Sequence, residues 1–564
     1  MNPNPVASPQ PVTRPRRLAL PDAWGVGVVA TALLLSLPVL VVFSFIFYPA
    51  GDVWRHLAET VLADYVVNSL LLMVGVAIGT LTMGISTAWL TSMCEFPGRR
   101  FFEWALLLPM AVPAYIIAYT YTGMLGFEGP IQDALREAFG WGYGDYWFPE
   151  IRSLGGAIAM LSLVLYPYVY LLARAGFLEQ SVCVLEVSRT LGLGPWASFF
   201  RVALPLARPA IITGLSLALM ETLADYGTVQ YFGVSTFTTG IFRTWFGLGD
   251  SAAAAQLSAL LMGFVFLLIV LERWSRRRAR FHHTSNRYLQ LPRHRLSGTR
   301  LALALLACLL PLLLGFVVPA GQLAVWAWQT AGTMVDADFI ALTRNSLMLA
   351  SLAALIAVGL ALLMGYGKRL RPTPLMVASV RVAAMGYAVP GTVIAVGVML
   401  PFAWTDNAID AWMRAQFGIS TGLILSGTLV ALLFAYTVRF LAVSIQTVEA
   451  GLGKIRPTMD DAARSLGMPP RQVLRKIHMP IMRGTLLTAI LLVFVDVLKE
   501  LPATLILRPF NFNTLAVRTF ELASDERLAD ASTAALAIVV AGIVPVIILS
   551  RSISRSRPGH EHAA

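Results

Sequence analysis

The sequence has 564 residues, of which 57% are apolar and only 13% are charged, and its mean hydropathy is +0.70. Soluble domains carry about 25% charged residues, so a soluble protein is excluded and most of the chain is predicted to contact lipid or buried protein. Basic cytoplasmic loops that set membrane orientation account for the net charge of +12, and nucleic-acid binding is not indicated. Three scattered cysteines without C-x-x-C spacing indicate neither a disulfide framework nor a metal site.

In chain order, residues 1–24 form a basic tail, and the apolar run that follows is too long for a signal-peptide core. We therefore predict an uncleaved first span. A helix needs about 20 apolar residues to cross the hydrocarbon core. The sequence contains twelve runs of about that size, near 25–48, 66–93, 101–126, 154–174, 209–230, 253–272, 302–326, 342–367, 375–402, 421–447, 485–506 and 533–550.

The distribution of basic residues predicts the orientation of these spans. Most of the 43 Lys and Arg residues fall in the tails and in the loops that lie on the same side as the tails. Because cytoplasmic loops are enriched in Lys and Arg, both termini are predicted to be cytoplasmic. The most basic stretch, 273–300, is predicted to be a cytoplasmic linker that contacts anionic lipid headgroups.

The chain contains an internal repeat. Residues 68–70 (Asn-Ser-Leu) and 111–113 (Ala-Val-Pro) recur 277 positions later, and later segments recur with an offset of 275. The first half is therefore residues 25–272 and the second is 301–550, followed by a tail at 551–564. An even number of spans in each half makes the repeats parallel, related by an axis along the membrane normal. The predicted fold is an all-α membrane protein of two parallel six-helix repeats.

Each half has one long polar loop between its fourth and fifth spans, at 175–208 and 448–484. A helix-forming run starts at Glu186 or Asp461, and a glycine six residues later (Gly192 or Gly467) permits a left-handed turn that ends it. A second amphipathic run is predicted to stop at Pro205 or Pro480, because proline cannot continue a helix. Surface helices occur in many membrane proteins, but two copies in equivalent loops indicate a shared role.

These loops resemble the coupling loop of binding-protein-dependent ABC importer permeases. The second half matches the pattern with Asp461-Ala462-Ala463, Gly467, Ile477 and Pro480, and the first half matches with Glu186, Gly192, Val202 and Pro205. The first half departs from it with Val187 and Ser188 in place of Ala-Ala. The fused arrangement, and stretches such as 223–228 and 499–504, resemble the ferric-iron branch of the family.

The resemblance implies the transmembrane subunit of a type I importer in the bacterial inner membrane. It implies that two copies of a cytoplasmic ATPase dock on the loops and that a periplasmic binding protein delivers the substrate. The likeness to the ferric-iron branch implies that this substrate is ferric iron. Fused permeases for thiamine or phosphonate share much of the pattern and stay as alternatives. The sequence lacks a phosphate-binding loop of its own, so we expect no enzymatic activity and no cofactor in this chain, and ATP bound by the partner.

Ionisable residues at membrane depth mark candidate functional sites. The fifth span carries Glu221 and Asp225, and its repeat mate carries Asp496 and Glu500 at the 275 offset. Each pair is spaced i, i+4, so its members are expected to share one helix face. Four hard oxygen donors around a central axis suit the passage of a multiply charged cation.

Two alternatives stay open at this level. The carboxylates could instead be structural, either paired with Arg381, Arg439 or Lys499 or capping a broken helix before Gly227 and Pro502. The chain could also be an ion-coupled secondary carrier built from two six-span halves, although a carrier has no need of the duplicated cytoplasmic loop.

Overall fold

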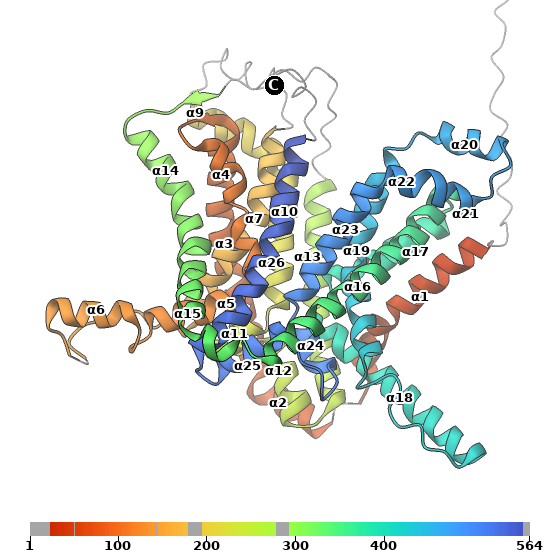
Figure 1. Cartoon of the computed structure of the whole chain (residues 1–564). Helices are drawn as coiled ribbons and strands as arrows, with labels where there is room; N and C mark the ends of the chain where they lie inside the picture. Colours follow the sequence, from red (N-terminus) through yellow and green to blue (C-terminus); the bar gives the residue numbers. More distant parts are fainter. Residues whose placement is uncertain (1–22, 50, 143, 179–194, 278–292, 556–564) are drawn as a thin grey trace, which may run out of the picture.

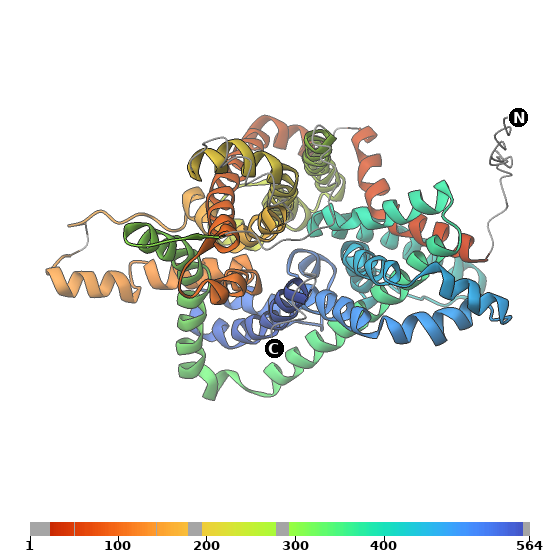
Figure 2. The same ribbon diagram turned by 90° about the horizontal axis from the view of Figure 1, so that it is seen from above.

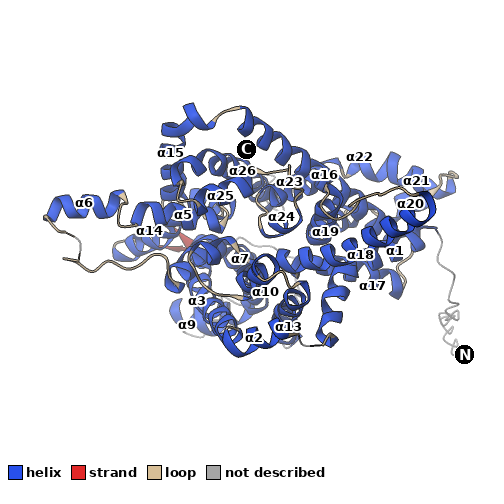
Figure 3. Cartoon of the chain, turned by 90° about the horizontal axis from the view of Figure 1, so that it is seen from below, coloured by secondary structure: helices blue, strands red, loops and turns tan. Residues whose placement is uncertain are grey.

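The computed structural model describes residues 23–49, 51–142, 144–178, 195–277 and 293–555. Within these ranges the chain is almost entirely helical (Figures 1 and 3). The described strands are β1 (Cys94–Glu95) and β2 (His294–Arg295), which pair in parallel and attach the end of the linker to the first half. The tail 1–22 and much of the linker 273–300 lie outside the described residues.

The apolar runs of the sequence form membrane-length helices. In the part of the chain that the structure describes, ten helices are long and apolar enough to cross a membrane, and the number reaches 12 if each of two sharply bent helix pairs is one span. The prediction of about twelve spans in an all-α fold is therefore confirmed.

The first half comprises these helices: α1 (Ala23–Ser44), η1 (Phe45–Phe47), α2 (Asp52–Thr60), α3 (Leu62–Met93), α4 (Arg99–Ala105), η2 (Leu108–Ala111), α5 (Ala114–Leu125), α6 (Pro130–Phe139), α7 (Leu154–Leu178), α9 (Pro195–Ser198), η3 (Phe199–Ala203), α10 (Leu204–Ala224), α11 (Gly227–Tyr231), α12 (Phe237–Phe242), η4 (Arg243–Gly247) and α13 (Ser251–Arg277).

The second half comprises these: α14 (Thr299–Leu312), η5 (Leu313–Val317), α15 (Val318–Met334), α16 (Ala337–Leu370), α17 (Pro374–Ala383), η6 (Ala384–Ala388), α18 (Gly391–Phe417), α19 (Leu429–Gly453), α20 (Pro457–Ser465), α21 (Pro470–Val473), η7 (Leu474–His478), α22 (Met479–Ile481), α23 (Arg483–Leu498), α24 (Pro502–Leu507), α25 (Leu515–Ser524) and α26 (Leu528–Arg555).

The third predicted span of the first half is not straight. The segments Arg99–Ala111 and Ala114–Phe139 are bent by 89° at Val112-Pro113. The bend follows from the sequence, because a residue before proline is disfavoured in the helical region. The Val389-Pro390 sequence breaks the chain at the equivalent place, between η6 and α18.

Beyond this break the two halves differ. The first half has Gly126, Gly129 and Pro130 between α5 and α6, whereas residues 402–407 contain neither glycine nor proline. The helix is therefore interrupted in the first half, and α18 continues to Phe417 in the second. Both α6 and the end of α18 extend sideways from the bundle in Figure 1.

The two halves interlock through their first spans. Helix α1 packs against α17 and α18 of the second half, whereas α14 and α15 of the second half pack against α3 and α5 of the first. Seen from above, the two halves lie side by side with these helices crossing between them (Figure 2). Each half therefore buries part of its apolar surface against the other.

The fifth span of each half ends earlier than the sequence indicated. We predicted spans at 209–230 and 485–506, but α10 ends at Ala224 and α23 ends at Leu498. Each is followed by a short break and a short helix, α11 or α24. Apolar composition alone could not show these breaks, because the residues on both sides of each break are apolar.

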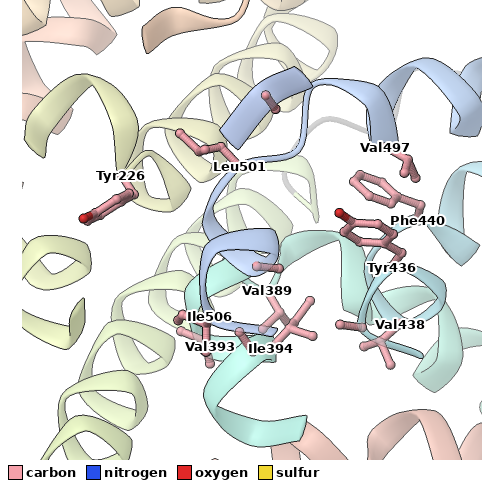
Figure 4. Close-up of a cluster of buried hydrophobic side chains, with 14 of the residues drawn as sticks. Tyr226, Val389, Val393, Ile394, Tyr436, Val438, Phe440, Val497, Leu501 and Ile506 are labelled. Atoms are coloured by element: carbon pink, nitrogen blue, oxygen red, sulfur yellow. The ribbon is translucent and has the colours of Figure 1, made fainter. Parts of the chain in front are cut away.

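A continuous hydrophobic core surrounds the two breaks. Figure 4 shows part of it, with Tyr436 and Phe440 of α19, Leu501 and Ile506 at α24, and Tyr226 of the first half. All five side chains are buried to at least nine-tenths. This core places the interrupted ends of α10 and α23 in the interior of the molecule, between the two halves.

Candidate functional site

The loop 448–484 of the second half contains the predicted helix and turn. Helix α20 carries Asp461, Ala462 and Ala463, and it begins at Pro457, four residues earlier than expected. Gly467 has φ +77°, which is the predicted left-handed turn, and its N–H donates to the Arg464 carbonyl at 2.9 Å. A Cβ atom at Gly467 would meet open space, so only the backbone conformation favours glycine there.

The second helical run does not stop at its proline, and this prediction is wrong. The π-helical turn η7, which contains Ile477, leads into α22, and Pro480 lies in the first turn of that helix. Proline is tolerated in a first turn because the N–H is not needed there. The run ends one residue later, at Ile481, and Pro470–Ile481 and Arg483–Leu498 meet at 81°.

In the first half, Pro205 likewise lies at the start of a helix, α10, which runs directly into the fifth span. The segment Phe199–Ala224 forms one membrane-length helix, without the bend found in the second half. Glu186 and Gly192 lie outside the described residues.

An ion cluster anchors α20 to the C-terminal end of α16. Asp460 accepts a hydrogen bond from Arg369 Nε at 2.8 Å and lies 2.5 Å from His478 Nε2. Burial would raise the pKa of Asp460, but the hydrogen bonds and charges of Arg369 and His478 lower it below its ordinary value. Arg369 also donates to the Leu452 and Ile455 carbonyls, so a single guanidinium joins α16, α19 and α20.

Sequence reasoning did not identify this cluster. The repeat equivalents of Arg369 and His478 in the first half are Ser92 and Ala203, so the repeat gave no signal. The available signal was an arginine directly after the predicted span 342–367 and an aspartate in the loop 448–484.

The four membrane carboxylates line one cavity between the two halves. It has a volume of about 130 Å³ and is also lined by Tyr168, Tyr387, Arg439 and Lys499. One water molecule needs about 10–15 Å³ of such cavity volume. The cavity can therefore hold an ion with part of its hydration shell. The acidic residues of this cavity are Glu221 and Asp225 from the first half and Asp496 and Glu500 from the second.

Asp225 and Glu500 cap the short helices beyond the breaks. Asp225 accepts from the Thr228 hydroxyl at 3.0 Å and from the Val229 N–H at 3.1 Å. Glu500 accepts from the N–H groups of Ala503 and Thr504, each at 3.2 Å. The carboxylates thus satisfy helix N–H groups that have no intrahelical partner.

These caps correct the expectation that each i, i+4 pair shares one helix face. Asp225 ends α10 in an extended conformation, and Glu500 lies beyond the last residue of α23. The i, i+4 relation requires a continuous helix, and both helices stop before it is complete.

Two basic residues pair with three of the four carboxylates. Arg439 of α19 lies 3.0 Å from Glu500 and 3.8 Å from Glu221, and Lys499 lies 2.9 Å from Asp496. Arg381, the third partner considered, is exposed on α17 and does not line the cavity. The contacts expected of structural carboxylates, both ion pairs and helix caps, are therefore present.

The cavity has an excess of negative charge. Four acidic and two basic residues give its lining a formal net charge of −2. Among the described residues, no group of three or more His, Cys, Asp or Glu side chains is arranged to hold a metal ion. The arrangement can compensate the charge of a passing cation without enclosing it in a coordination sphere.

Tyrosines of the fourth span divide into two kinds. Tyr166 and Tyr170 donate to the carbonyls of Leu106 and Glu103 and are fixed in packing. Tyr168 lines the cavity, and its hydroxyl hydrogen-bonds with that of Tyr387. Sequence reasoning missed Tyr387, whose repeat equivalent is Met110, also in the lining.

Comparison with known proteins supplies the family. The profile of the binding-protein-dependent transport system inner membrane component matches this chain twice, at residues 81–281 and 357–558. The chain belongs to this family. It is therefore a permease of the ABC importer type, which decides against the alternative of an ion-coupled secondary carrier.

The relatives of this permease include ferric permeases that match most of its length. It is 26% identical to an Fe(3+)-transport system permease protein of Haemophilus influenzae over 92% of this chain and 97% of that protein. It is 23% identical to a ferric transport system permease protein of Actinobacillus pleuropneumoniae over 84% of this chain and 71% of that protein. A molybdenum transport system permease protein of Escherichia coli is 27% identical over 36% of this chain and 87% of its own length.

Proposed function

We propose that this permease moves ferric iron, delivered by a periplasmic binding protein, across the bacterial inner membrane. ATP is hydrolysed by two copies of a separate cytoplasmic subunit, which dock on the loops 175–208 and 448–484. Both termini lie in the cytoplasm in this proposal, in agreement with the distribution of Lys and Arg. The full-length similarity to ferric permeases supports iron as the substrate.

The charge of the cavity is the structural observation that carries the proposal. A multivalent cation at membrane depth needs compensating charge, since an uncompensated charge in a low-dielectric medium is prohibitive. Glu221, Asp225, Asp496 and Glu500 supply that compensation, and Arg439 and Lys499 offset only half of it. Binding stays weak enough for the ion to leave.

A second candidate is an oxyanion permease. Relatives described as molybdenum and probable sulfate permeases match about a third of this chain, and Arg439 and Lys499 could contact an anion. The net charge of −2 opposes this reading, because an oxyanion would be repelled by the unpaired carboxylate charge.

The experiment is an uptake assay in a strain deleted for this gene. Cells complemented with the wild-type chain should regain uptake of labelled iron and show no change with labelled thiamine, phosphonate or molybdate. Glu221→Gln and Asp496→Asn, which keep shape but remove charge, should lower iron uptake strongly, and the double variant most. The matched control is Asp64→Asn, which changes an exposed acid at the start of α3.

Assembly must be measured on the same preparations. We expect normal ATPase association and hydrolysis with reduced transport per complex. Restored uptake of thiamine, phosphonate or molybdate without iron would overturn the proposed substrate. Unchanged iron transport per complex in the double variant, with lower thermal stability, would leave these carboxylates as structural residues.

A further inference from the structure

Arg439 bridges the two halves inside the cavity. Its side chain is 11% exposed, with Nη1 3.0 Å from Glu500 of its own half and Nη2 3.8 Å from Glu221 of the other. A guanidinium stays protonated under all physiological conditions. It therefore gives the two carboxylates a permanent positive partner.

The space for this guanidinium is provided by a glycine. Gly391 begins α18, and a Cβ atom there would overlap both Arg439 Nη1 and the Glu500 carboxylate. Any larger residue would push the ion pair from its position. The position of the ion pair between Arg439 and Glu500 therefore depends on a glycine at position 391.

The first half lacks this arrangement. The repeat equivalents of Arg439 and Gly391 are Val164 and Ala114, and the equivalent of Lys499 is Ala224. Among the described residues, no ion pair to Asp225 is found, and its carboxylate is held by the cap to α11. The positive charges of the cavity thus come from the second half alone.

We propose that Arg439 is an internal competitor of the transported cation. It occupies Glu221 and Glu500 when no cargo is present, and an arriving hard cation must displace it. When the cargo moves on, the guanidinium returns and prevents the carboxylates from retaining the ion. This inference rests on the proposed function, since it assigns to Arg439 the release of the cation that the carboxylates attract.

The geometry also gives an order of events. The contact with Glu221 is the longer one and joins residues of different halves, so a relative movement of the halves separates it first. The shorter contact with Glu500 lies within one half and keeps Arg439 in place. Glu221 then becomes available to the cation before Glu500 does.

The test measures binding of Tb³⁺, a hard trivalent ion without redox chemistry, to the full chain in lipid nanodiscs. Tyrosines of the cavity can sensitise its luminescence. Arg439→Met should bind Tb³⁺ roughly ten-fold more tightly than wild type, a typical size for coupled binding events. Arg439→Lys should stay near wild type, because it keeps the charge. Arg381→Met, which removes an exposed arginine outside the cavity, is the matched control.

A second variant covers the case in which Arg439→Met does not assemble. Gly391→Ala keeps every charged group but displaces the guanidinium, so it should tighten Tb³⁺ binding in the same direction and by less. Adding Glu221→Gln and Glu500→Gln to either variant should remove the gain, which places the ion at these carboxylates. Unchanged or weaker Tb³⁺ binding in the variant that assembles would overturn the proposal.

The outcome is separate from that of the substrate assay. Iron uptake by wild-type cells tests the proposed function, whereas the difference in Tb³⁺ affinity between wild type and variant tests the role of Arg439. In the uptake assay, Arg439→Met should transport iron slowly despite its tighter binding. Normal transport together with tighter binding would also contradict the role in release.

Discussion

The two halves of this permease share a capped break in the fifth span but differ in the charged residues around it. In each half, the fifth span breaks, and the carboxylate at the break, Asp225 or Glu500, caps the short helix that follows. The basic residues of the cavity come from the second half, where Arg439 pairs with Glu500 and Lys499 pairs with Asp496. In the second half, Asp460 joins α20 to Arg369 and His478, whereas the equivalent segment of the first half lies outside the described residues.

This difference shows which of these residues the fold requires in both halves and which can differ between them. A helix that begins in the membrane interior needs a partner for its first N–H groups, because no water can replace it. The capping acid is therefore needed in both halves. The basic side chains of Arg439 and Lys499 are not needed for the caps. A chain with two repeats can therefore carry them in one half only.

The largest expected effect in this comparison is on stability. Glu500→Gln breaks a buried ion pair as well as weakening a cap, so it should cost about 3 kcal/mol. Asp225→Asn keeps a side chain that caps about as well as Asp and should cost well under about 1 kcal/mol. Apparent melting temperatures of the purified chain in one detergent would measure both. Equal losses for the two variants would show that the ion pair with Arg439 adds nothing to the cap.

The second prediction concerns the anchored coupling helix. Asp460→Asn removes the charge that joins α20 to Arg369 and His478, so transport per ATP hydrolysed should fall several-fold while the spans stay folded. We expect a fall of this size because a hydrogen bond to a charged group contributes about 1.5–3 kcal/mol. Transport and hydrolysis measured together in proteoliposomes would test it, and unchanged coupling would contradict a role for the anchor.

The same anchor has a predictable pH dependence. The pKa of Asp460 is lowered in the folded chain, so its contribution to stability is present above the unfolded value of about 3.9. That contribution is lost as the pH falls through the lowered pKa. The stability difference between wild type and Asp460→Asn should therefore shrink on acidification below about pH 4.

The smallest expected effect comes from the turn after α20. Gly467→Val forces a branched residue into a left-handed conformation, which costs about 1–2 kcal/mol. Membrane insertion should be normal, and ATPase association should weaken. Gly453→Val, in the same region but without a positive φ, is the control. Wild-type association and uptake in Gly467→Val would count against a coupling role for this loop.

The sequence alone determined the architecture of this protein. Apolar runs of membrane length and the repeat at offsets of 277 and 275 predicted about twelve helices in two parallel halves. These features are local or periodic, so the sequence shows them without the tertiary structure. The glycine turn at Gly467 was predictable for the same reason, since a left-handed residue after a helix is a local backbone requirement.

Only the tertiary structure decided how the halves meet. The exchange of first spans and the continuation of helix beyond Pro480 have no signal in composition. The breaks after Ala224 and Leu498 were one of the alternatives that the sequence left open, and the structure decided for them. The pairing of Arg439 with Glu221, over 200 residues away in the chain, is likewise set by packing. Sequence reasoning could name these charges as candidates, but the burial of charge is a property of the assembled interior, where partners from distant segments must meet.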